Sequence, residues 1–146
     1  MIGELNQVDS TKIIEKNKKG VLKVEGENIT YECNGKYFPF LKGEYLEYYN
    51  NRKLNQLGIY DEVGTLTYGQ KFNRKGQLQS ELIATKIGTK TSNLCEFLNN
   101  YDYLTIHLTE NYYKYSKSLD STYKYKTAYF IDGKKIRTEK FDKPKR

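Results

Sequence analysis

The chain holds the residue types of a thiol hydrolase, but not in an arrangement that supports one. His107 is the single histidine, and Cys33 and Cys95 are the two cysteines. A cysteine nucleophile needs a neighbouring base and a third group that orients that base. No local motif around either cysteine supplies them. Apolar residues flank His107, which is typical of a strand position beside a core, so we expect a structural histidine.

The carboxylates and glycines give no stronger case for catalysis. Glu44 and Glu47 flank Tyr45 on a predicted strand, but positions three apart on a strand point to opposite faces, which argues against a general acid–base pair. Asp61 and Glu62 have the character of turn residues. The glycines are spaced for turns rather than for a phosphate-binding loop. We therefore expect a non-enzymatic protein with no catalytic residues, no metal site and no cofactor.

The cysteines and the N-terminal segment bear on the compartment. Cys33 and Cys95 permit one disulfide at most, and free, packed thiols are the default expectation. Met1 to Lys19 lacks the apolar core of a signal peptide, and no run approaches the roughly 20 apolar residues of a membrane span. We expect a cytoplasmic protein. A signal peptide removed before the first numbered residue would instead indicate the periplasm.

The elements that would position any site read as strands. Apolar and polar residues alternate with period two before Asn34-Gly35, the strongest short hairpin motif, and Lys36 to Leu41 is the predicted return strand. A frame of an aromatic residue, three residues, a turn residue, one residue and an apolar residue then recurs at uneven separations, which indicates a degenerate repeat. The predicted turns are Asn34-Gly35, Asn51-Arg52, Lys75-Gly76 and Asp132-Gly133. The fold class is therefore mainly β, an antiparallel sheet of consecutive hairpins.

One segment departs from this pattern. Leu94, Phe97, Leu98 and Tyr101 have helical spacing, which predicts one short helix over residues 93–101. We expect a single domain over residues 1–146. Its parts are an ambiguous N-terminal segment at 1–19, hairpin repeats at 20–90, the helix plus a three-stranded C-terminal meander at 91–141, and a tail at 142–146.

Residues 43–80 resemble the MORN-type repeat, in the variant found in small bacterial antitoxin-like and immunity-like proteins. The resemblance rests on Gly43-Glu-Tyr45-Leu-Glu-Tyr48-Tyr49-Asn-Asn51-Arg52-Lys-Leu54, followed by Gly58-Ile-Tyr60 and Gly64. Arg52 departs from it, because that family has glycine there. The resemblance implies a hairpin sheet used as a binding surface. In bacterial relatives it also implies neutralisation of a cognate toxin.

The tyrosines suit such a protein–protein surface, since a rigid amphipathic ring gives contact area at low entropic cost. The predicted partner-binding residues are Tyr45, Tyr48, Tyr49, Tyr60, Tyr123, Lys124 and Tyr125. Tyr48 and Tyr49 are adjacent and so are expected on opposite faces, unless the second ring covers a neighbouring repeat. The leading hypothesis is an immunity or antitoxin-like inhibitor that covers the active site of a toxin.

Charge supplies the alternative. Residues 111–146 hold eleven Lys and Arg against four Asp and Glu, whereas residues 1–110 hold fourteen of each. Lysines interleave with tyrosines between Tyr113 and Lys126, as in a basic–aromatic module for nucleic acid or another anionic surface. Strict alternation would place Tyr and Lys on opposite faces, which weakens this alternative. A scaffold role for the repeat sheet is a third hypothesis.

Overall fold

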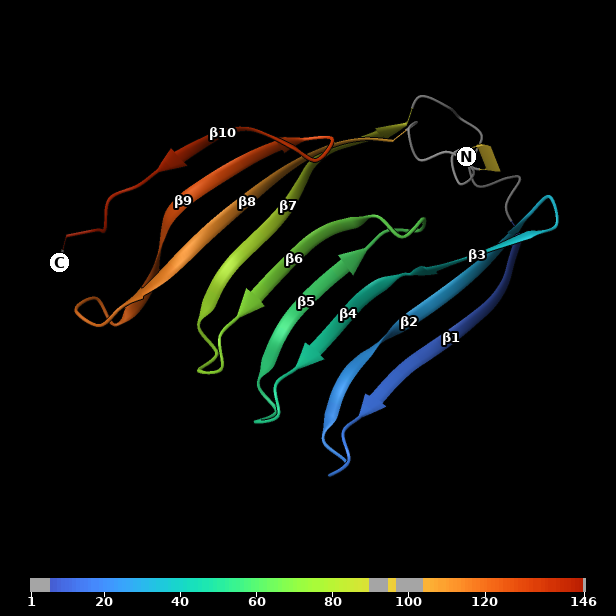
Figure 1. Ribbon diagram of the computed structural model, residues 1–146, viewed down its shortest axis with the longest axis horizontal. Helices are drawn as coiled ribbons and strands as arrows, with labels where there is room; N and C mark the ends of the chain where they lie inside the picture. The colour runs from blue at the N-terminus through green and yellow to red at the C-terminus, as the bar shows by residue number, and fades with distance from the viewer. Residues whose placement is uncertain (1–5, 90–94, 97–103, 146) are drawn as a thin grey trace.

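The computed structural model describes residues 6–89, 95–96 and 104–145, and they form one open, ten-stranded antiparallel sheet (Figure 1). The strands are β1 Asn6–Lys16, β2 Leu22–Cys33, β3 Lys36–Leu41, β4 Gly43–Tyr48, β5 Leu54–Tyr60, β6 Leu66–Phe72, β7 Leu78–Thr89, β8 Leu104–Ser116, β9 Ser121–Ile131 and β10 Lys134–Lys140. The spatial order is β1-β2-β4-β5-β6-β7-β8-β9-β10, with β3 paired to β2. The predicted antiparallel sheet of consecutive hairpins is confirmed.

Strands β3 and β4 pair with different parts of β2, one after the other along its length. β3 pairs with residues 28–33 of β2, whereas β4 pairs with Val24 and Glu25. Between them the N–H of Lys42 donates to the carbonyl of Glu27 at 3.0 Å, and Gly43 follows with φ of 69°. β3 and β4 therefore behave as one bent strand alongside β2.

Four hairpins share one turn of five residues: 17–21, 49–53, 61–65 and 73–77. In each, the first residue donates its N–H to the carbonyl of the fifth, and the fourth donates to the carbonyl of the first. Asn17, Asp61 and Asn73 open three of these turns, and the side-chain oxygen of each accepts the N–H groups of the third and fifth residues. The fourth residue has positive φ in every copy.

These turns define a strict period over the centre of the chain. The fourth turn residues Arg52, Gly64 and Gly76 follow one another at intervals of 12 residues. Tyr48, Tyr60 and Phe72 keep the same interval, as do Leu54, Leu66 and Leu78. The prediction of uneven repeats is wrong here, because Tyr60, Gly64 and Leu66 supply a copy of the frame that the sequence interpretation passed over.

The remaining predicted elements have mixed outcomes. Asn34-Gly35 has φ values of 53° and 79°, and Asp132-Gly133 has 49° and 83°, so both are the tight turns predicted for them. The ambiguous N-terminal segment contains β1, and the C-terminal meander consists of β8, β9 and β10. Of the predicted helix over 93–101, Cys95 and Glu96 have helical backbone, and its other residues lie outside those described. No described helix is long and apolar enough to cross a membrane.

The sheet is a single layer and buries little. The core cluster among the described residues is Ile29, Tyr31, Cys33 and Cys95, with Phe38, Phe40 and Val63 packed against it. The rings of Tyr31 and Phe40 lie 6.3 Å apart between centroids, and Phe40 also touches Gly64 in the β5–β6 turn. This cluster lies where β2 and β3 meet that turn.

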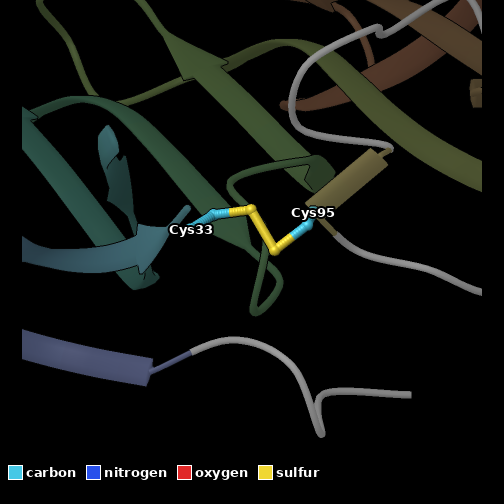
Figure 2. The surroundings of a disulfide bond; sticks show 2 residues. All are labelled: Cys33 and Cys95. Atoms are coloured by element: carbon cyan, nitrogen blue, oxygen red, sulfur yellow. A yellow bond between two sulfur atoms is a disulfide. The ribbon is translucent and has the colours of Figure 1, made fainter. Parts of the chain in front are cut away.

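A disulfide closes the cluster. Cys33 at the end of β2 is bonded to Cys95 in the connection between β7 and β8, with the two Cα atoms 5.6 Å apart (Figure 2). Cys33 is 1% exposed and Cys95 is 7% exposed. The expectation of free thiols is wrong, because the topology brings together two residues that lie 62 positions apart in the chain. The bond links the end of β2 to the β7–β8 connection, across the three intervening strands β4, β5 and β6.

The turn glycines predict a graded loss of stability on substitution. Gly20 and Gly64 share φ of +78°, but a Cβ at Gly20 meets nothing within 4 Å, whereas a Cβ at Gly64 would lie 2.6 Å from Phe40. Gly20→Ala should lower the free energy of unfolding by about 1–2 kcal/mol. Gly64→Ala should cost about 1–3 kcal/mol more, because the core must shift. Urea unfolding measures both, and equal losses would contradict the packing of Phe40 on this turn.

The disulfide predicts a larger effect. The double variant Cys33→Ala/Cys95→Ala should lose about 4 kcal/mol of unfolding free energy, since the bond restricts a long loop in the unfolded chain. Chemical unfolding with and without a thiol reductant provides the measurement. The wild type should be weakened by the reductant and the double variant should not respond to it. A wild-type midpoint that reductant leaves unchanged would show that the bond carries no stability.

Candidate functional site

Pairing register assigns each side chain to one of two faces. Residues directly opposite in adjacent antiparallel strands share a face. One row runs from Tyr45 on β4 through Gly58, Gly69, Leu82 and Glu110 to Ala128 on β9. We call this side the glycine face. The opposite side carries Glu25 and Glu81 and is called the glutamate face.

Tyr45 and Tyr60 meet on the glycine face. Their rings are perpendicular, with 6.4 Å between centroids, an arrangement that aromatic pairs favour. Glycines provide the room: a Cβ at Gly26 would lie 2.9 Å from the Tyr45 ring, and one at Gly58 would lie 3.0 Å from the Tyr60 ring. Any larger side chain at these two positions would displace the rings.

Beside this pair lies a shallow depression of about 210 Å³. Its floor is Gly58 and Gly69, its walls include Leu66 and Leu82, and Lys71 stands exposed at its margin. The depression is partly enclosed and mostly apolar, so its size and lining suit an inserted side chain of a partner.

The same face continues into a cationic ladder on β8 and β9. The Nζ atom of Lys114 lies 4.3 Å from the centroid of the Tyr125 ring, and that of Lys126 lies 4.3 Å from the centroid of Tyr112. The two rings lie 6.4 Å apart. The expectation that Tyr and Lys lie on opposite faces is wrong here. The register shift opposite Tyr112 and Tyr113 inserts Tyr125 as an extra residue, which breaks the alternation.

The glutamate face holds a hydrogen-bonded network instead. Glu81 accepts hydrogen bonds from the hydroxyl of Tyr68 at 2.8 Å, the amide of Asn111 at 3.1 Å and the hydroxyl of Tyr113 at 3.3 Å. Thr127, 2% exposed, donates to the side-chain oxygen of Asn111 at 2.7 Å. These hydrogen bonds link side chains of β6, β7, β8 and β9, so the network fixes the register of these four strands.

The predicted partner-binding tyrosines therefore divide. Tyr48 lies on the glutamate face, where its hydroxyl donates to Glu25 at 2.6 Å. Tyr49 lies in the turn after β4, and its hydroxyl donates to the carbonyl of Phe72 at 2.6 Å. The guanidinium of Arg74 stands 5.2 Å from the centre of its ring. Tyr49 thus covers the neighbouring hairpin, which is the alternative that the sequence left open.

The predicted C-terminal residues also divide. Tyr125 belongs to the cationic ladder, and Tyr123 pairs directly with Lys114 in the β8–β9 register. Lys124 contacts the ring of Phe141, with 4.9 Å from Nζ to the centroid. The predicted partner-binding residues left out Lys71, Tyr112 and Lys126, which share the glycine face with Tyr45 and Tyr60; Lys126 was predicted only as part of the basic–aromatic alternative. The position of each β-bulge would have been needed to find them.

The candidate catalytic residues do not converge. Glu44 and Glu47 lie on opposite faces, opposite Ile59 and Gln56 respectively. His107 is half-buried on β8 between Lys86 and Ile131. Among the described residues, no group of three or more His, Cys, Asp or Glu side chains could hold a metal ion.

Comparison with known proteins finds no matching family model, no matching curated protein and no matching solved structure.

Three tyrosines predict a loss of stability in strong alkali. The hydrogen bond to Glu25 and burial raise the pKa of Tyr48 to about 12, and burial with a hydrogen bond to a carboxylate does the same for Tyr68 and Tyr112. Their ordinary pKa is 10.0. Because the folded-state pKa is raised, the stabilisation is complete below about pH 10 and is lost as the pH rises through about 12.

Urea unfolding across this pH window, together with ultraviolet titration of the phenols, measures the effect. Tyr68→Phe should remove one late-ionising phenol and make the loss less steep. If every phenol of the folded protein ionised near pH 10, the hydrogen bonds to Glu25 and Glu81 would be absent in solution.

Proposed function

We propose that this protein is a non-enzymatic inhibitor of the immunity or antitoxin type, which uses its glycine face to cover the active site of a cognate toxin. The observation that carries the proposal is the continuity of that face. The strand register places the Tyr45–Tyr60 pair and its apolar depression on the same face as the cationic ladder of lysines and tyrosines on β8 and β9.

This combination suits a protein partner. Protein interfaces concentrate aromatic side chains at their centre and polar groups at their rim. Here Tyr45 and Tyr60 supply rigid rings, and Lys71 and Lys126 supply charge that favours an acidic partner surface. The resemblance of residues 43–80 to the MORN-type repeats of immunity-like proteins supports the same class.

The nucleic-acid alternative is weaker on this face. Lysine ammonium groups already stand over the rings of Tyr112 and Tyr125, where a stacked base would have to lie.

The disulfide favours a compartment that does not reduce thiols, so we propose that the inhibitor meets its toxin outside the cytoplasm. This replaces the cytoplasmic expectation drawn from the sequence.

Co-expression with the product of the adjacent reading frame tests the proposal. The complex should co-purify, and the inhibitor should protect cells from that product. Tyr60→Ala should weaken binding at least about tenfold, as truncation of a central interface tyrosine does. Lys71→Glu, an exposed change at the margin of the depression, should also weaken it.

Matched controls lie on the other face. Lys86→Glu reverses an exposed charge on the glutamate face, and Tyr115→Ala removes a ring that is 42% exposed there. Both should bind within about threefold of the wild type, as rim positions do. The proposal fails if the adjacent product neither binds nor is neutralised, or if the two faces respond alike.

A further inference from the structure

The cations of four turns gather at one end of the sheet, although they are dispersed in the sequence. The turns after β1, β4, β6 and β8 all lie at the same end of their strands, along the lower edge in Figure 1. They carry the cationic side chains Lys18, Lys19, Arg52, Lys53, Arg74, Lys75 and Lys117, and one carboxylate, Asp120. We call this set of turns the basic rim.

The opposite end of the sheet differs in charge. Its described turns carry Asp61 and Glu62 between β5 and β6 and Asp132 between β9 and β10. The residues beside Asn34-Gly35 there include both Glu32 and Lys36, and Lys134 and Lys135 follow Asp132-Gly133, so this end carries charges of both signs. The neutral balance of residues 1–110 thus conceals a separation of charge along the strands.

The rim cations are available to a ligand. All seven are exposed. None of the seven has an ion pair within 4.0 Å to a described carboxylate, in contrast to Arg137, which pairs with Glu139. Lys53 donates to the carbonyl of Lys75 at 3.2 Å, and Asn51 to that of Arg74 at 2.9 Å. These bonds hold adjacent turns in line without neutralising their charge.

The spacing of the rim turns and the length of the row that they form match those of a linear polyanion. Successive turns are two strands apart, about 10 Å, since neighbouring strands are spaced by about 4.8 Å. The four turns therefore span about 30 Å, which approaches one helical turn of B-form duplex. A duplex carries one negative charge per about 1.7 Å of its axis, so it meets such a row at any register.

Other occupants fit less well. A protein interface needs apolar anchors and is depleted in lysine, but the rim consists of flexible cations. Single strands bind through exposed rings that stack on bases. The one aromatic ring in these turns is that of Tyr49. Its hydroxyl donates a hydrogen bond to the carbonyl of Phe72, and the guanidinium of Arg74 covers its ring.

From these observations we propose that the basic rim binds the phosphate backbone of double-stranded nucleic acid, without sequence preference. This goes beyond the proposed inhibitor function and does not depend on it, because the rim lies at the strand ends and not on the glycine face. The binding is electrostatic: lysine and arginine displace the counterions that surround the phosphates.

Fluorescence anisotropy with a labelled mixed-sequence duplex of about two helical turns tests the proposal across about 50 to 200 mM salt. The wild type should show a steep log–log salt dependence. Lys18→Gln/Lys19→Gln/Lys75→Gln/Lys117→Gln should lower the slope by about 3–4 and weaken binding at least about 100-fold at about 100 mM salt.

A control of equal charge is Lys12→Gln/Lys86→Gln/Lys134→Gln/Lys135→Gln, which removes four exposed lysines away from the rim. This control variant should bind within about fivefold of the wild type. Both variants should have the melting temperature of the wild type, since exposed side chains contribute little to folding. Equal weakening by the two variants would overturn the proposal. So would wild-type binding to polyglutamate or to anionic lipid vesicles as tight as to the duplex.

Discussion

Across residues 6–89 and 104–145 the chain forms one sheet with no second layer against which to bury its side chains, and this constraint shapes the described structure. Ile29 and Cys33 are its largest fully buried side chains among the described residues. Stability must then come from the backbone ladder and from pairs across adjacent strands, with the disulfide as a cross-link. The abundance of tyrosine suits this, because a ring can cover a neighbouring strand while its hydroxyl is hydrogen-bonded, as in Tyr48, Tyr49 and Tyr68.

The regular turn determines where charge goes. From Arg52 to Gly64, and again from Gly64 to Gly76, one strand and one turn together take 12 residues. Because each strand crosses the sheet once, successive turns fall at opposite ends of the sheet. Turns separated by two such steps return to the same end. Lysine and arginine in alternate turns therefore become neighbours, although residues 1–110, which contain three of the four basic turns, hold as many acidic as basic side chains. The basic rim is a product of topology, and no local motif encodes it.

What the sequence could predict was what local chemistry decides. Asn34-Gly35 and Asp132-Gly133 specify their turns through backbone preference alone, and their strands follow. The turn at Asp61–Gly64 was equally local: Asp61 and Glu62 were predicted to be turn residues, but the copy of the repeat frame that contains them was not recognised. The partners of Cys33 and Tyr49 were beyond reach, since each lies on another hairpin or connection. Assignment to a face also failed wherever an extra residue shifted the alternation, as at Tyr125.

That last shift has consequences for function. With unbroken alternation, the tyrosines of β9 would present bare rings on one face and lysines on the other. The bulge places Lys114 and Lys126 over the rings of Tyr125 and Tyr112, so each cation is held against a π-face and projects from the glycine face. On such a surface the ammonium groups already occupy the ring faces on which bases would stack. Such a surface suits the carboxylates of a protein partner, as in the inhibitor that we propose. The rim that we propose for nucleic acid lies instead at the strand ends, where Arg74 is the one rim cation recorded over a described aromatic ring.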